Sequence, residues 1–130
     1  MRKLIVSLVV FSLLFTIYPA NISGIGKRKA AFIFLALDAN PREHRAVIST
    51  PDVELTIVGV RDYQEAVKIS QELVEKGVRS IILCASFGHI GVAKVTKAVE
   101  NKAMVGVVRY DRHPGLGFKS GDERYEKMKA

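Results

Sequence analysis

The sequence predicts a small α/β protein, a two-layer or three-layer sandwich around a mostly parallel sheet of four strands. Three observations lead to this prediction. Apolar runs of strand length alternate with segments of helical periodicity, which is the pattern of strand–helix–strand crossovers. Several of these runs are continuously apolar, as in strands buried on both faces. The chain has 130 residues, enough for one domain with a real core. The expected fold is a Rossmann-like half with two main, right-handed crossover helices.

The first strand is predicted over residues 30–37, which are all apolar and end at Asp38. The next residues, Asn40-Pro41-Arg42-Glu43, have the pattern of a helix start, with Asn40 as N-cap and Pro41 at the first helical position. Two interpretations fit the residues after this start. Either the helix continues to Val47 for one or two turns, or residues 46–50 form a short strand.

A second strand is predicted over residues 53–60, which first alternate and then become apolar, so we place this strand near a sheet edge. Asp62 and Glu65 form a capping arrangement for the next helix. Gly77 ends that helix. Its inner face is expected to hold residues at helical spacing, namely Ala66, Ile69, Ser70, Leu73 and Val74.

Residues 78–85 are predicted to be the central strand. A turn over Ser86–Gly91 then opens a second amphipathic helix, whose inner face is marked by Val92, Val95, Ala98 and Val99. The last strand is expected over residues 103–108, where Gly106 would mark the close approach of a neighbouring element. The tail, residues 109–130, is rich in glycine and closes with a charged stretch of short-helix character.

The first 29 residues form a hydrophobic leader, and residues 30–130 form a single α/β domain. Arg2-Lys3 precedes an uncharged run that extends to Tyr18, which is typical of a secretory signal. The run could instead be an uncleaved anchor, with the membrane reached through residues 4–25, or the true start could lie further downstream. The location depends on this choice: cytoplasmic for a misplaced start, otherwise exported or membrane-anchored.

The basic character of the chain belongs to the leader. The net charge is +7, but residues 1–29 hold five of the 20 basic residues and no acidic one, which leaves 15 basic against 13 acidic residues in the domain. A net charge of +2 gives little electrostatic drive toward nucleic acid, and we predict no nucleic-acid partner. The single cysteine, Cys84, excludes an internal disulfide framework.

Polar residues follow the carboxyl ends of the predicted parallel strands, and these ends meet at one edge of the sheet. Ligands of open α/β sheets bind at this edge. The turn after residue 85 would also offer N–H groups and a helix dipole to an anion. The candidate ligand-binding residues are Ser86, Gly88, His89, Arg109, Asp111 and His113. Each also has a structural interpretation: Ser86 as a helix cap, His89 as a solvated first-turn residue, and the residues after 108 as an ion-paired loop.

No motif assigns a catalytic activity, so the sequence leaves open whether the protein is an enzyme. Asp111 and His113 could form an oriented acid–base pair. Cys84 has the apolar flanks of a small buried residue rather than of a reactive thiolate. The histidines at positions 44, 89 and 113 do not match a metal-binding spacing. Neither a metal nor a cofactor is predicted.

Four short sets of residues are spread along the domain: His44-Arg45-Ala46-Val47-Ile48, Val58-Gly59-Val60, Leu83-Cys84 with Phe87-Gly88, and Val107-Val108-Arg109-Tyr110-Asp111 with His113-Pro114-Gly115. In this order they resemble a family of small proteins designated domain of unknown function 6506. The resemblance covers about residues 30–124 and implies an intact domain, without an activity that could be transferred. We expect a protein that binds a small anionic metabolite at the carboxyl edge of the sheet. The alternative is a non-catalytic interaction module, a homodimer whose tail mediates association.

Overall fold

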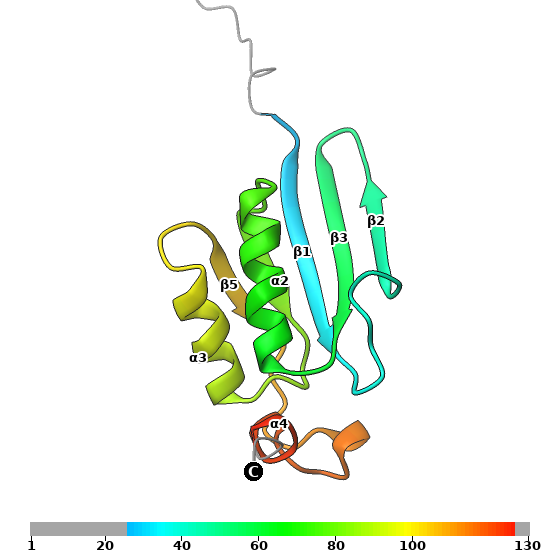
Figure 1. Cartoon of the computed structure of the whole chain (residues 1–130), viewed down its shortest axis with the longest axis vertical. Coiled ribbons are helices and arrows are strands. Elements are labelled where there is room, and N and C mark those ends of the chain that lie inside the picture. The colour runs from blue at the N-terminus through cyan, green and yellow to red at the C-terminus, as the bar shows by residue number, and fades with distance from the viewer. Residues whose placement is uncertain (1–25, 127–130) are drawn as a thin grey trace, which may run out of the picture.

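The computed structural model describes residues 26–126 as one α/β unit (Figure 1). Along the chain the elements are β1 (Arg28–Leu35), β2 (Arg45–Ser49), β3 (Val53–Val60), α2 (Tyr63–Glu75), β4 (Ser80–Leu83), α3 (His89–Ala98), β5 (Met104–Val107), the 3-10 helix η1 (Pro114–Leu116) and α4 (Gly121–Tyr125). The predicted leader lies largely outside these residues, although Arg28 and Lys29, which the prediction assigned to it, begin β1. None of the helices within residues 26–126 has the length and apolar character needed to cross a membrane.

The sheet has five strands in the order β2-β3-β1-β4-β5, and β2 is its one antiparallel member. The mostly parallel α/β sheet is therefore confirmed, with one more strand than the four expected. The extra strand is the second of the two interpretations for residues 46–50, because Arg45–Ser49 folds back on β3. The centre of the sheet is β1, and not the strand before Ser86 as predicted, because two strands lie on each side of β1 in the sheet order.

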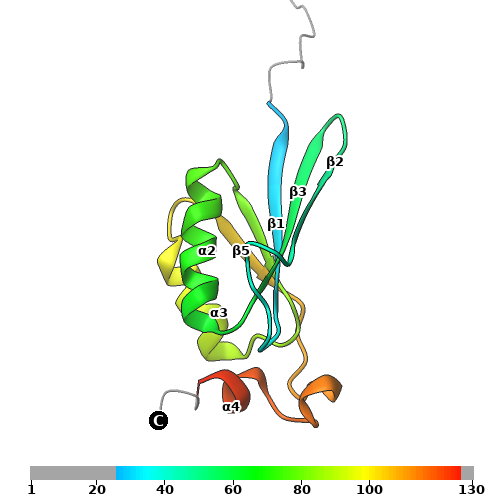
Figure 2. The same cartoon turned by 45° about the vertical axis from the view of Figure 1, so that its right-hand side comes forward.

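Helices α2 and α3 both cover the same face of the sheet, which gives two layers (Figure 2). The strand order explains this. The connection from β3 to β4 and the connection from β4 to β5 both step in the same direction across the sheet. Right-handed crossovers that step in the same direction place their helices on the same side. The step from β1 to β3 goes the other way and contains β2 rather than a long helix.

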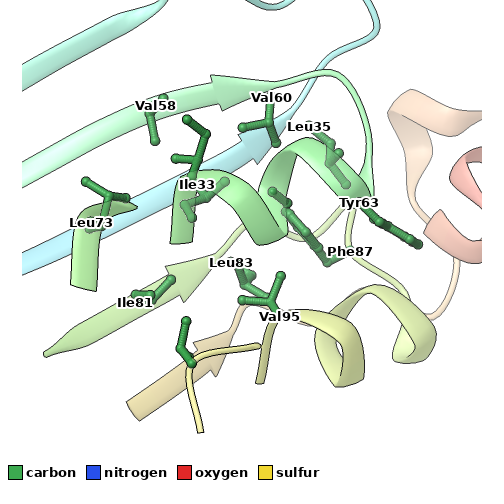
Figure 3. Close-up of a cluster of buried hydrophobic side chains, with 14 of the residues drawn as sticks. Ile33, Leu35, Val58, Val60, Tyr63, Leu73, Ile81, Leu83, Phe87 and Val95 are labelled. Carbon is green, nitrogen blue, oxygen red and sulfur yellow. The ribbon is translucent and has the colours of Figure 1, made fainter. Parts of the chain in front are cut away.

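The core lies between this face and the two helices (Figure 3). Asp62 caps the start of helix α2, because its side chain accepts a 2.8 Å hydrogen bond from the Glu65 N–H, as the capping pattern predicted. Its buried residues include all five predicted ones and also Tyr63. Burying a Leu or Ile side chain contributes about 1.5–3 kcal/mol, and the fully buried set includes Ile33, Leu73, Ile81, Leu83, Val58, Val60, Val95 and Val99.

Two local predictions need correction. The segment after Asn40 forms a hydrogen-bonded turn rather than a helix, with the His44 N–H donating to the Asn40 carbonyl at 2.8 Å. The chain must pass directly into β2, which leaves no room for a second turn. Gly106 marks no close approach among the described residues, because a Cβ at this position would meet nothing within 4 Å.

Candidate functional site

The site is built where the carboxyl ends of the parallel strands meet the C-terminal segment. Figure 1 shows η1 and α4 lying across the end of the sheet, next to the start of α3. This segment is held locally by a capping box, in which the Ser120 Oγ accepts from the Glu123 N–H and the Glu123 carboxylate accepts from the Ser120 N–H. The capping box starts α4 at Gly121 and so places Asp122 over α3.

The Asp122 carboxylate fills the position at the α3 N-terminus where an anion was predicted to bind. Its Oδ2 accepts a hydrogen bond from the Ile90 N–H at 3.1 Å, and its Oδ1 accepts from the Gly91 N–H at 3.3 Å. These are N–H groups of the first helical turn, which lack partners within the helix and carry the positive end of its dipole. The N–H groups that were predicted to bind an anionic ligand therefore already donate to a carboxylate of the chain itself.

Tyr63 ties this cap to the core. Its hydroxyl donates to Asp122 Oδ1 at 2.9 Å and accepts from the Gly88 N–H at 3.1 Å. The ring is buried and stacks on Phe87, with centroids 5.6 Å apart. Burial raises the pKa of the Tyr63 phenol well above its usual range, and the neighbouring Asp122 carboxylate adds to this shift. The phenol therefore stays protonated and remains a donor to the carboxylate.

Two glycines allow this contact to be so close. A Cβ at Gly121 would lie 1.9 Å from the Ser86 carbonyl oxygen, and a Cβ at Gly88 would lie 2.4 Å from Asp122 Cγ. Real Cβ atoms do not approach other heavy atoms to such distances. Glycine is thus required at both positions by the docking of the C-terminal segment onto the turn before α3.

Four of the six predicted site residues line one hollow of about 380 Å³ between the start of α3 and the segment after β5: Gly88, His89, Arg109 and Asp111. The other lining residues are Phe87, Val92, Val107, Tyr110 and Ser120. Within the hollow the Arg109 guanidinium pairs with the Asp111 carboxylate at 2.7 Å. Both side chains are well exposed, 56% for Arg109 and 76% for Asp111.

The other two predicted residues, Ser86 and His113, line a different hollow of about 620 Å³ together with Leu35, Arg124 and Tyr125. Ser86 is buried, and the N-cap of α3 is Gly88 rather than Ser86. The Nδ1 of His113 accepts a 3.0 Å hydrogen bond from the Gly115 N–H, which caps η1. Since Asp111 pairs with Arg109, the structure does not orient Asp111 and His113 as an acid–base pair.

The remaining candidates are distributed over the fold. Cys84 is half-buried and packs against the core. The Nδ1 of His44 accepts from the Asn40 N–H at 2.8 Å, within the turn before β2. Within residues 26–126, no three His, Cys, Asp or Glu side chains are grouped so that they could hold a metal ion.

The site also contains two residues that the sequence did not single out, Tyr63 and Asp122. Asp122 carries a weak sequence signal, because Ser120 and Glu123 around it have the capping-box spacing that starts a helix with an acidic first turn. Tyr63 carries none beyond its position beside the Asp62 cap. A long-range pair of this kind, 59 residues apart, has no periodicity that could reveal it.

The model of a family of unknown function, DUF6506, matches residues 28–123. The chain belongs to this family. The match runs from the first residue of β1 into α4. It therefore contains the whole sheet, both large helices and Asp122. The comparison with curated proteins and with solved structures gave no significant match.

Proposed function

We propose that this member of the DUF6506 family binds a small anionic ligand in the 380 Å³ hollow at the carboxyl edge of its sheet. The observation that supports the proposal is the convergence of Gly88, His89, Arg109 and Asp111 on this one hollow. They come from the turn after β4 and the segment after β5, and open α/β sheets bind ligands at this edge.

The size and lining of the hollow suit a small molecule. Pockets for small ligands have volumes of roughly 300–1,000 Å³ and combine an apolar surface with a few polar groups. Here Phe87, Val92 and Val107 supply the apolar surface, and His89 and Arg109 supply the polar groups. A ligand with a short carbon skeleton and one charged end would match both.

Arg109 is the group that would bind the negative charge. Its present partner, Asp111, lies two residues away, and the ion pair is exposed to solvent. Exposed pairs contribute only about 0–1 kcal/mol, so replacing Asp111 by a ligand carboxylate or phosphate costs little. A guanidinium can then bind two oxygens of the ligand at once.

The Asp122 cap limits the positions that an anionic ligand could take at the start of α3. Because the N–H groups of Ile90 and Gly91 already donate to Asp122, a ligand would not sit on the axis of α3 as a phosphate does in a glycine-rich loop. It would lie beside the helix start, against the side chains of His89 and Arg109. This geometry favours a carboxylate or phosphate held by side chains.

A thermal-shift screen of the full chain against small carboxylates, phosphates and nucleotides tests the proposal. A ligand at a hundredfold excess over its dissociation constant stabilises the native state by about 2.7 kcal/mol. Arg109→Ala should abolish the shift. The matched control is Arg112→Ala, which removes an exposed arginine that does not line the hollow. The proposal is wrong if no compound shifts the transition, or if both variants respond like the unchanged protein.

A further inference from the structure

The face of the sheet opposite the helices is an apolar surface that α2 and α3 do not cover. Register identifies its residues, since side chains paired across adjacent strands point to the same side. Phe32 pairs with Ile57 on one side and with Ile82 on the other, and Ile82 pairs with Gly106. The remaining side chains are assigned by alternation along each strand. The open face includes Ala46, Ile48, Leu55, Ile57, Ala30, Phe32, Ser80, Ile82, Met104 and Gly106, with Arg28 and Val53 at the amino end of β1 and β3 and with Phe34 and Gly59 at their carboxyl end.

This open face is unusual for a surface in water. Met104 is 80% exposed, Ile48 53% and Ile82 38%, and they come from three different strands. At the strand positions that point to this side the only charged residue is Arg28, the first residue of β1. Contiguous apolar patches of several hundred Å² on a monomer mark binding surfaces.

One corner of the face is covered by the chain itself. Gly59 points to this side, and the atoms nearest to its position are the ring of Phe34 and the Cβ of Ala39. Ala39 is buried and belongs to the connection between β1 and β2. That connection therefore closes the carboxyl end of the face, and no other part of residues 26–126 covers the remainder.

We infer that the open face binds the same face of a second copy of this chain, forming a homodimer with a sheet-on-sheet interface. The area is sufficient for a weak dimer. Strands β1 and β3 hold eight residues each, β2 holds five, and β4 and β5 hold four each. At a rise of about 3.3 Å per residue and a strand spacing of about 4.8 Å, the footprint is about 450 Å². Two copies then bury about 900 Å², which is the size of weak, transient interfaces.

Two further observations favour a second copy as the occupant. A twofold dimer brings a patch against itself, which is unfavourable for a charged patch and favourable for an apolar one. The family match begins at residue 28 and so contains the whole face but not the preceding segment. The open face thus belongs to the family domain, and in a twofold dimer the open face of each copy packs against the open face of the other.

Analytical ultracentrifugation of the full chain over a concentration series tests the dimer. We expect reversible dimerisation with a dissociation constant on the order of micromolar, as for interfaces at the low end of the size range. Met104→Lys should raise this constant about tenfold or more, because it places an unpaired charge in the interface. Phe118→Lys is the matched control: Phe118 is 67% exposed but lies in the C-terminal segment, and its change should leave the constant within about twofold.

Thiol labelling identifies the face directly and does not depend on a disruptive variant. In a Cys84→Ala background, Met104→Cys should react rapidly with a maleimide at nanomolar protein and slowly above the dissociation constant. A monomer at every concentration overturns the inference, as does a dimer that responds to Phe118→Lys and not to Met104→Lys. Protection of Met104→Cys that does not change with concentration also overturns it, since the residues before β1 or another molecule would then cover the face.

Discussion

Removing the Asp122 carboxylate should destabilise the protein by about 2–4 kcal/mol. In Asp122→Ala the buried Tyr63 hydroxyl loses its acceptor, and leaving a buried donor unpaired costs about 1–3 kcal/mol. The N–H groups of Ile90 and Gly91 lose their cap, which costs about 1 kcal/mol. For a domain of this size the loss corresponds to a fall in Tm of roughly 10–20 °C.

Urea denaturation followed by circular dichroism measures this loss, and two variants make it specific. Asp122→Asn keeps one acceptor oxygen for the Tyr63 hydroxyl and the Gly91 N–H. It removes the charge and places an NH2 donor opposite the Ile90 N–H, so it should cost about 1–2 kcal/mol through the lost hydrogen bond and the helix dipole. Asp111→Ala removes a carboxylate that is 76% exposed and that pairs with Arg109, an exposed arginine. This control should change the free energy of unfolding by less than about 1 kcal/mol.

A double-mutant cycle isolates the contact with the phenol. In a Tyr63→Phe background no hydroxyl is left to be orphaned, so Asp122→Ala should cost about 1–2 kcal/mol less than in the unchanged protein. If Asp122→Ala costs less than about 0.5 kcal/mol, the assignment of Asp122 as the cap of α3 is refuted. If it costs the same in both backgrounds, the contact between Asp122 and the Tyr63 hydroxyl is refuted.

Three further predictions concern packing and ionisation. Gly121→Ala should destabilise the protein by about 1–3 kcal/mol, because its Cβ would overlap the Ser86 carbonyl oxygen. The control, Gly106→Ala measured on dilute monomer, should be neutral or slightly stabilising. If both variants lose the same free energy of unfolding, the close approach of Gly121 to Ser86 is contradicted. Ser70→Ala should be neutral or should raise stability by about 1 kcal/mol, since the Ser70 hydroxyl is buried without a hydrogen-bond partner among the described residues. A clear loss of stability in urea denaturation would show that this hydroxyl does have a hydrogen-bond partner. The free energy of unfolding should fall as the pH rises above the ordinary tyrosine pKa of 10.0. The unfolded chain then releases the phenol proton, while folded Tyr63, with its raised pKa, retains it. The Tyr63→Phe variant should show a smaller fall over the same pH range, and an identical profile would contradict the raised pKa of Tyr63.

The parts of the fold that were predictable are those encoded locally. Helix α2 could be placed from the spacing of Ala66, Leu73 and their neighbours, because one buried face imposes a 3.6-residue period. The start at Asp62 was equally local, since a cap and the N–H group that donates to it lie three residues apart. Strand order is not encoded in this way. The central position of β1 depends on pairing with β3 and β4, which are both distant in sequence.

The candidate site likewise has one part that could be predicted from the sequence and one part that could not. That His89 and Arg109 would share one hollow could be predicted from the parallel topology, which brings the strand ends together. The occupant of the α3 N-terminus could not, because a helix start offers the same N–H groups to a ligand and to a carboxylate of its own chain. Only the docking of the C-terminal segment decides between them, and it depends on Gly121 fitting against Ser86.

The topology connects the two proposed surfaces. Because the crossovers through α2 and α3 step in the same direction, both helices cover one face and their N-termini come near the same edge as the strand ends. The edge thereby gains the polar groups of the proposed ligand site, and within residues 26–126 no helix covers the other face. A dimer through that face would not block the ligand hollow, since the lining residue Val92 belongs to α3 on the opposite side. Ligand binding and dimerisation should therefore be separable: Arg109→Ala should leave the dimer intact, and Met104→Lys should leave ligand binding intact.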